Sequence, residues 1–163
     1  MKKAGVLCAI LTLLGISCSI VEPTSAGSYA YDNLIFEIAP TPGTAPSESA
    51  LLEFSDLLEY YGFCNQKYIG FVVQQEKDCD APAVWQLSYI QNMELRRRSL
   101  VDSNINDRTG VIFVSYVFGS YMDGHVHKKI AGLQYSSSSF AMFRSSLQNC
   151  EPQLLLHEFC HMF

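Results

Sequence analysis

The segment LLLHEFCHMF, residues 154–163, combines an apolar run with two histidines and a glutamate at fixed spacing. On an α-helix, residues four positions apart lie on one face, so His157 and His161 would direct their imidazoles toward one point. Two imidazoles at this spacing suit one Zn²⁺, and Glu158 beside them is placed to take a proton from a metal-bound water. The apolar turn at residues 154–156 predicts a buried helix that holds these side chains rigidly. The segment therefore predicts zinc ligands at His157 and His161 and a catalytic base at Glu158.

A third zinc ligand is missing from this segment, because a catalytic zinc site uses three protein ligands and an open fourth position. The sequence stops two residues after His161, where zinc peptidases continue into a turn and a third ligand. We therefore expect the sequence to be the N-terminal part of a longer protein. His125 and His127 are an alternative source, since alternate residues of a strand point to one face. A histidine pair in a loop with glycine and lysine is, however, more often solvated surface.

Upstream of this segment, apolar periodicity predicts alternating strands and helices. Strands are expected at residues 34–38, 69–73, 111–118, 130–135 and 139–143, with helices at residues 48–61 and 83–100 and a long loop at residues 119–129. Ser47 is placed to cap the first helix and Gly62 to end it. The order of elements predicts a single α/β (α+β) domain. Its sheet would be mixed and mostly parallel with an antiparallel edge strand, covered by two packing helices and the C-terminal helix.

The first 26 residues predict export from the cytoplasm. Lys2 and Lys3 precede an apolar run over residues 4–20, and small residues follow at positions 24–26, the pattern of a signal peptide. Cys18 offers a competing route, in which a lipid on this cysteine would anchor the chain to a membrane surface. We expect a leader over residues 1–26 or cleavage before Cys18, a folded domain over residues 27–163, and a protein of the cell envelope that is lipid-anchored, periplasmic or secreted.

The composition narrows the choice of partners. Hydrophobic residues make up 48% of the 163 positions and charged residues 17%, so the chain can bury a sizeable core. Eleven Lys and Arg against sixteen Asp and Glu give a net charge of −5. Without a basic stripe beyond residues 96–98, nothing is available to neutralise a phosphate backbone, which excludes nucleic acid as the expected partner.

Four cysteines remain after the leader: Cys64, Cys79, Cys150 and Cys160. An even number in an oxidising compartment suggests disulfides, and three connectivities are open. Cys64 with Cys79 is the preferred pair, because these two residues flank one expected strand. Zinc–thiolate binding is the less favoured alternative, since no C-x-x-C spacing occurs.

From residue 31 to residue 163 the sequence resembles bacterial membrane or lipoprotein metalloproteases of the metzincin-like zincins. The most specific match is residues 155–163, with softer support from residues 34–38, 110–118 and 130–143. The resemblance implies the N-terminal subdomain of a zincin, a zinc endopeptidase acting on a protein or peptide. The substrate would pair along an edge strand near residues 130–135.

The resemblance also assigns the site residues and shows two departures. It makes His157 and His161 the zinc ligands and Glu158 the base. Cys160 stands where the family has glycine, and the family's glycine turn and downstream ligand lie beyond the last residue, so we expect this stretch by itself to lack turnover. Two alternatives stay open: a non-catalytic envelope lipoprotein or binding module with a relic H-E-x-x-H helix, and another zincin branch whose third ligand is a later glutamate.

Overall fold

The structure is a computed structural model that describes residues 33–63, 68–77, 82–100, 109–144 and 150–162. The chain divides into one unit of residues 1–30 and a second of residues 31–163, and all of the described residues belong to the second. The expected leader, Cys18, Cys64 and Cys79 lie outside the described residues. Within the described ranges, no helix has the length and apolar character needed to cross a membrane.

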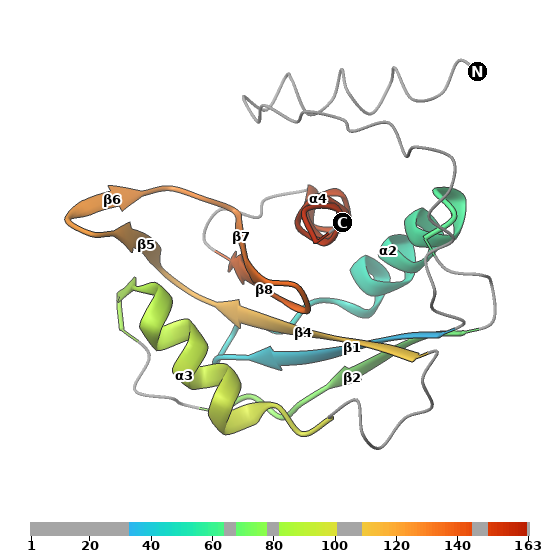
Figure 1. Ribbon diagram of the computed structural model, residues 1–163, viewed down its shortest axis with the longest axis horizontal. Helices are drawn as coiled ribbons and strands as arrows, with labels where there is room; N and C mark the ends of the chain where they lie inside the picture. Colours follow the sequence, from blue (N-terminus) through green and yellow to red (C-terminus); the bar gives the residue numbers. More distant parts are fainter. Residues whose placement is uncertain (1–32, 64–67, 78–81, 101–108, 145–149, 163) are drawn as a thin grey trace, which may run out of the picture. The chain divides into compact units, whose positions relative to one another are not determined.

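A five-stranded sheet forms the centre of the described domain (Figure 1). Its strands are β1 (Asn33–Pro40), β2 (Tyr68–Val73), β4 (Thr109–Val117), β7 (Gly132–Ser136) and β8 (Ser139–Phe143). They are ordered β2-β1-β4-β8-β7; the first four run parallel and β7 is antiparallel to β8. Every residue of β4 is buried, as expected for a central strand covered on both faces. The predicted mostly parallel sheet with an antiparallel edge strand is confirmed.

Helices cover both faces of this sheet. Figure 1 shows α2 (Glu48–Tyr60) and α4 (Glu151–Cys160) on one face and α3 (Leu87–Arg97) on the other. Phe36 of β1 lies beneath the first pair, with ring centroids 5.0 Å from Phe54 of α2 and 5.6 Å from Phe159 of α4. Aromatic contacts at these distances add to the burial of apolar surface. They fix α4 against the sheet and therefore fix the residues that it carries.

The ends of α2 follow the sequence closely. The Ser47 hydroxyl accepts a hydrogen bond from the Ala50 backbone N–H at 3.2 Å, as an N-cap does. At the other end, Gly62 has a φ of 71°, a left-handed conformation that glycine adopts without a steric penalty. Both predicted ends of this helix are confirmed.

The expected helix at residues 83–100 begins later than predicted, because its first residues form strand β3 (Val84–Trp85). The Trp85 side chain is buried, and its indole N–H donates to the Phe118 carbonyl oxygen at 2.8 Å. A buried indole needs such an acceptor. The contact ties β3 to the chain just after β4, and α3 starts only at Leu87.

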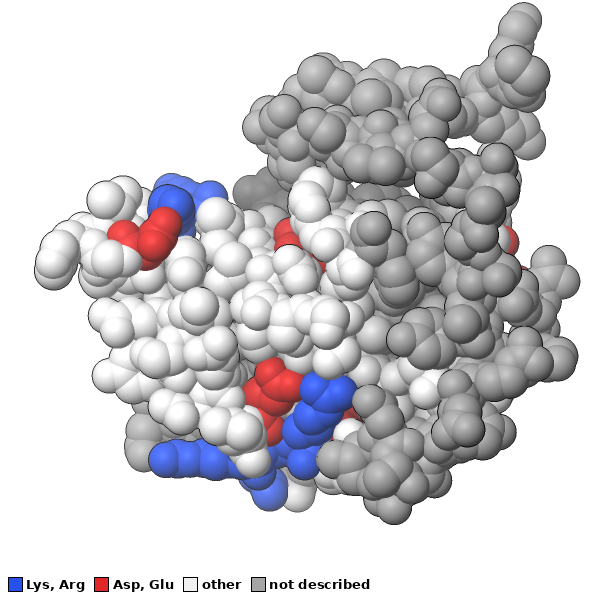
Figure 2. All heavy atoms as spheres, in the orientation of Figure 1, with Lys and Arg blue, Asp and Glu red and all other residues white. Residues whose placement is uncertain are grey.

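The expected loop at residues 119–129 is wrong as well, because it folds into a hairpin. Strand β5 (Ser120–Asp123) pairs antiparallel with β6 (Val126–Lys128), and β3 joins β5 in parallel to make a second sheet of three strands. Lys128 and Asp123 form an exposed ion pair across the hairpin, with N and O atoms 2.6 Å apart. In the space-filling view, blue and red side chains touch at the place where Figure 1 draws this hairpin (Figure 2).

The C-terminal end of α3 is set by a buried carboxylate on β1. Glu37 has no exposed surface, and its two oxygens accept the backbone N–H groups of Ser99 at 2.9 Å and Leu100 at 3.1 Å. These N–H groups would continue a helix only by donating to carbonyls one turn earlier. The helix therefore ends at Arg97 rather than at the predicted residue 100.

Candidate metal centre

Helix α4 carries the three residues that the sequence singled out. Pro152 lies in its first turn, where a missing N–H costs nothing. Leu154, Leu155, Leu156 and Phe159 are all buried, which confirms that the apolar turn before the motif belongs to the core. The helix is thus held by packing, and its orientation determines where the two histidines point.

The imidazoles of His157 and His161 converge. Their Nε2 atoms lie 3.0 Å apart, and the ring planes are at 86° to each other with centroids 4.5 Å apart. Zinc–nitrogen bonds of 2.0–2.1 Å at a tetrahedral angle would require an Nε2–Nε2 separation of about 3.3 Å. The observed separation, which in the structure is that of a hydrogen bond between the two rings, is within a few tenths of an ångström of the spacing for a shared Zn²⁺.

The surroundings of the pair favour neutral imidazole on His157, which is half-buried while His161 is exposed. Burial lowers the pKa of His157 from its ordinary value, and the nearby charge of His161 lowers it further. A metal ligand must present an unprotonated nitrogen. His157 is therefore in the protonation state that a metal ion requires at neutral pH.

Glu158 lies on the sheet side of α4 and is only 6% exposed. Burial raises the pKa of its carboxyl group to about 7, while a hydrogen bond from the Gln134 backbone N–H opposes the rise. A carboxyl group with a pKa near the working pH both accepts and returns a proton efficiently. Its environment therefore suits the base that the motif predicts.

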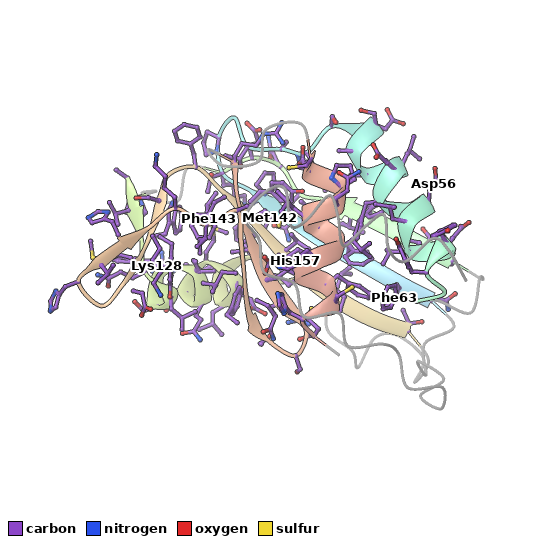
Figure 3. The ribbon with its side chains drawn as sticks, turned by 90° about the horizontal axis from the view of Figure 1, so that it is seen from above. Asp56, Phe63, Lys128, Met142, Phe143 and His157 are labelled. Carbon is purple, nitrogen blue, oxygen red and sulfur yellow. The ribbon has the colours of Figure 1, made fainter. Side chains whose placement is uncertain are left out.

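Two residues of the edge strand β7 contact this carboxyl group, and the sequence motif pointed to neither of them. Gln134 donates its backbone N–H to Glu158, and Gly132 lies directly against the Glu158 side chain. Strand β7 and helix α4 are adjacent in space (Figure 3), although fourteen residues, 137–150, separate them in sequence. Only the three-dimensional arrangement makes these two residues part of the site.

The hairpin histidines do not join the pair on α4. His125 and His127 are exposed, and Figure 3 shows the hairpin residue Lys128 well away from His157. Among the residues that the structure describes, no group of three His, Cys, Asp or Glu side chains is placed to hold a metal ion. The alternative in which His125 or His127 completes the site receives no support from the described part of the chain.

The structure limits the disulfide connectivity. Cys150 is the N-cap of α4 and Cys160 its last residue, so about 15 Å of helix separates their Cα atoms. A disulfide needs Cα atoms within about 7 Å, which excludes a bond between these two. The pairing of Cys64 with Cys79 stays a prediction, because both residues lie outside the described ranges.

Comparisons with known proteins identify no relative: no family model, no curated protein and no solved structure matches the chain. The fold is a mixed α/β arrangement with a mostly parallel sheet and, among the described residues, three helices. A functional assignment must therefore rest on the geometry of the site.

Proposed function

We propose that this protein is a zinc-dependent metallopeptidase of the cell envelope, with the zincin-like architecture that its sequence resembles. One observation carries the proposal. The Nε2 atoms of His157 and His161 lie 3.0 Å apart on α4, and the next residue after His157, Glu158, has a buried carboxyl group. His157 and His161 would hold the metal ion. We expect the third ligand to come from residues outside those that the structure describes.

The chain's own residues have distinct roles in peptide-bond hydrolysis. A bound Zn²⁺ would polarise the peptide carbonyl and make water more acidic. Glu158, with its pKa near 7, would accept the proton released during attack and pass it to the leaving amine. Strand β7 supports an extended peptide as substrate, because it stands at the edge of the described sheet, where backbone groups are available to pair with another strand.

Zinc binding is the first test. The full-length protein should bind one zinc ion per chain, and His157→Ala or His161→Ala should each weaken binding by at least about 100-fold, since loss even of a ligand's supporting partner costs 10- to 100-fold. Isothermal titration with Zn²⁺ and the zinc-dependent rise of the unfolding temperature, Tm, measure this directly.

The exposed hairpin histidines are matched controls for that experiment. His125→Ala and His127→Ala remove the same kind of side chain from β6 and its turn and should leave zinc affinity unchanged. A wild-type protein that binds no zinc would refute the proposal, and so would hairpin variants that lose zinc as severely as the helix variants.

A further inference from the structure

The absence of a side chain at Gly132 is explained by Glu158. A Cβ atom built on Gly132 would approach the Cγ, Cδ and Oε1 atoms of Glu158 to within 2.5 Å. Carbon and oxygen atoms in contact normally stay at least about 3.4 Å apart. The Glu158 side chain can therefore keep its observed position only if residue 132 has no side chain.

Backbone conformation does not account for this glycine. The described glycines with positive φ are Gly43, Gly62, Gly119 and Gly124. Gly132 is not among them and lies in a regular antiparallel pair, opposite Met142. An alanine could adopt its backbone conformation, so the requirement for glycine is one of space beside Glu158.

Helix α4 cannot move away to make room, because the residues around Glu158 are locked in the core. Leu155 is 1% exposed and Phe159 is fully buried against Phe36. Close-packed interiors resist such shifts. What can move is the Glu158 side chain itself, which has three rotatable bonds and is held by the Gln134 backbone N–H.

We propose that Gly132 is a positioning residue: by lacking a side chain, it allows the Glu158 carboxyl group to keep its buried position against β7, one residue along α4 from His157. The catalytic consequence rests on the proposed function, whereas the steric coupling of Gly132 to Glu158 does not. A side chain at position 132 would push the carboxyl group out of its place and leave the two imidazoles where they are.

Gly132→Ala should therefore separate zinc binding from turnover. We expect zinc affinity within about threefold of the wild-type value, kcat for peptide cleavage reduced by about 10- to 100-fold, and KM little changed, because a displaced base affects the reacting step.

The matched control is Gly70→Ala on β2, at the opposite edge of the sheet. There an added Cβ would also collide with a side chain, the exposed ring of Tyr68, which can turn into solvent. Gly70→Ala should leave zinc affinity, kcat and KM unchanged.

A double-mutant cycle in the zinc-free protein tests the coupling without any activity measurement. Gly132→Ala should lower Tm by about 3–10 °C in the wild-type background, the range expected for overpacking. In a Glu158→Ala background the colliding atoms are gone, so the same change should cost almost nothing.

The outcomes distinguish this proposal from the proposed function. Equal loss of Tm in both backgrounds, or a Gly132→Ala variant with wild-type kcat, overturns the positioning role. If the wild-type protein neither binds zinc nor cleaves peptides but the cycle shows coupling, the metallopeptidase proposal fails and the steric role of Gly132 stands.

Discussion

Glu158→Gln is expected to reduce kcat for peptide cleavage by about 10²- to 10⁴-fold while zinc stays bound, the usual range for loss of a general base. Glutamine has nearly the same shape, so it still packs against Gly132, and its amide oxygen can accept the Gln134 N–H. It cannot accept a proton near neutral pH. Cleavage of a fluorogenic peptide library, zinc content by atomic absorption and Tm, measured on the full-length protein, separate these effects.

The control for this variant is Glu53→Gln. Glu53 lies on α2, is exposed, and accepts a hydrogen bond from Gln153 of α4 at 2.9 Å, so its replacement removes a carboxylate near the same helix without touching the site. It should leave kcat unchanged. Full activity in Glu158→Gln would contradict the assignment of the base. A wild-type protein that holds zinc without cleaving any peptide would favour the alternative of a binding module with a relic motif.

The sequence predicted those elements whose stability depends on local pattern and on burial of one apolar face. The helix carrying His157 and His161 follows from their spacing and from the apolar turn before it, and its position in the core is confirmed. Strand β8 was predicted with its observed bounds, residues 139–143, because it is a short apolar run that follows a serine-rich turn. In these segments local preference and tertiary packing agree.

The β5–β6 hairpin was not predicted from the local sequence pattern. The two residues between its strands are Gly124 and His125, and Gly124 has a φ of 61°, a positive value that a two-residue hairpin turn requires at its first position. Its flanking strands span only four and three residues, and β6 is fully exposed, so they give almost no hydrophobic periodicity. The predicted start of α3 was wrong for a different reason, because burial of Trp85 against distant residues outweighs the local helix preference.

The surroundings of Glu158 could not be predicted from one sequence at all. Nothing in the spacing of Gly132 or Gln134 relates them to a motif more than twenty residues later. Their contact with the carboxyl group arises because β7 lies at the sheet edge beside α4. Sheet order depends on long-range pairing, which the hydrophobic pattern of individual strands does not encode.

Glu37 is a buried carboxylate on β1 that the sequence analysis did not single out. It interrupts an otherwise apolar strand, and a carboxylate is almost never fully buried without partners. The structure supplies them: besides the two backbone N–H groups after α3, the Ser99 hydroxyl and the Gln74 side-chain amide donate to the same Oε1 atom, the latter at 2.6 Å. Gln74 in turn accepts from Arg97, which also donates to the Pro40 carbonyl at 2.7 Å. The network joins β1, β2 and the end of α3.

Glu37→Ala is therefore expected to lower the free energy of unfolding by about 3–5 kcal/mol, because it removes the shared acceptor and leaves several buried donors unpaired. That is a large fraction of the 5–15 kcal/mol typical of a domain. Urea unfolding followed by tryptophan fluorescence measures it directly, since Trp85 is the sole tryptophan and is 1% exposed beside α3. The change lies on the opposite face of the sheet from α4, so zinc affinity of the folded fraction should be unchanged.

Two further variants show whether the loss comes from the network rather than from any missing carboxylate. Glu37→Gln keeps one acceptor oxygen but turns an N–H₂ group toward a donor. Its free energy of unfolding should therefore lie between those of wild type and Glu37→Ala. Glu76→Gln is the matched control, because Glu76 also accepts a backbone N–H, that of Gly43 at 3.1 Å, but does so at the surface. Exposed hydrogen bonds and charges contribute little, and this variant should stay within about 0.5 kcal/mol of wild type. A Glu37→Ala protein as stable as Glu76→Gln would mean that the buried donors find water once the carboxylate is gone, and that Glu37 does not hold the end of α3 against the sheet.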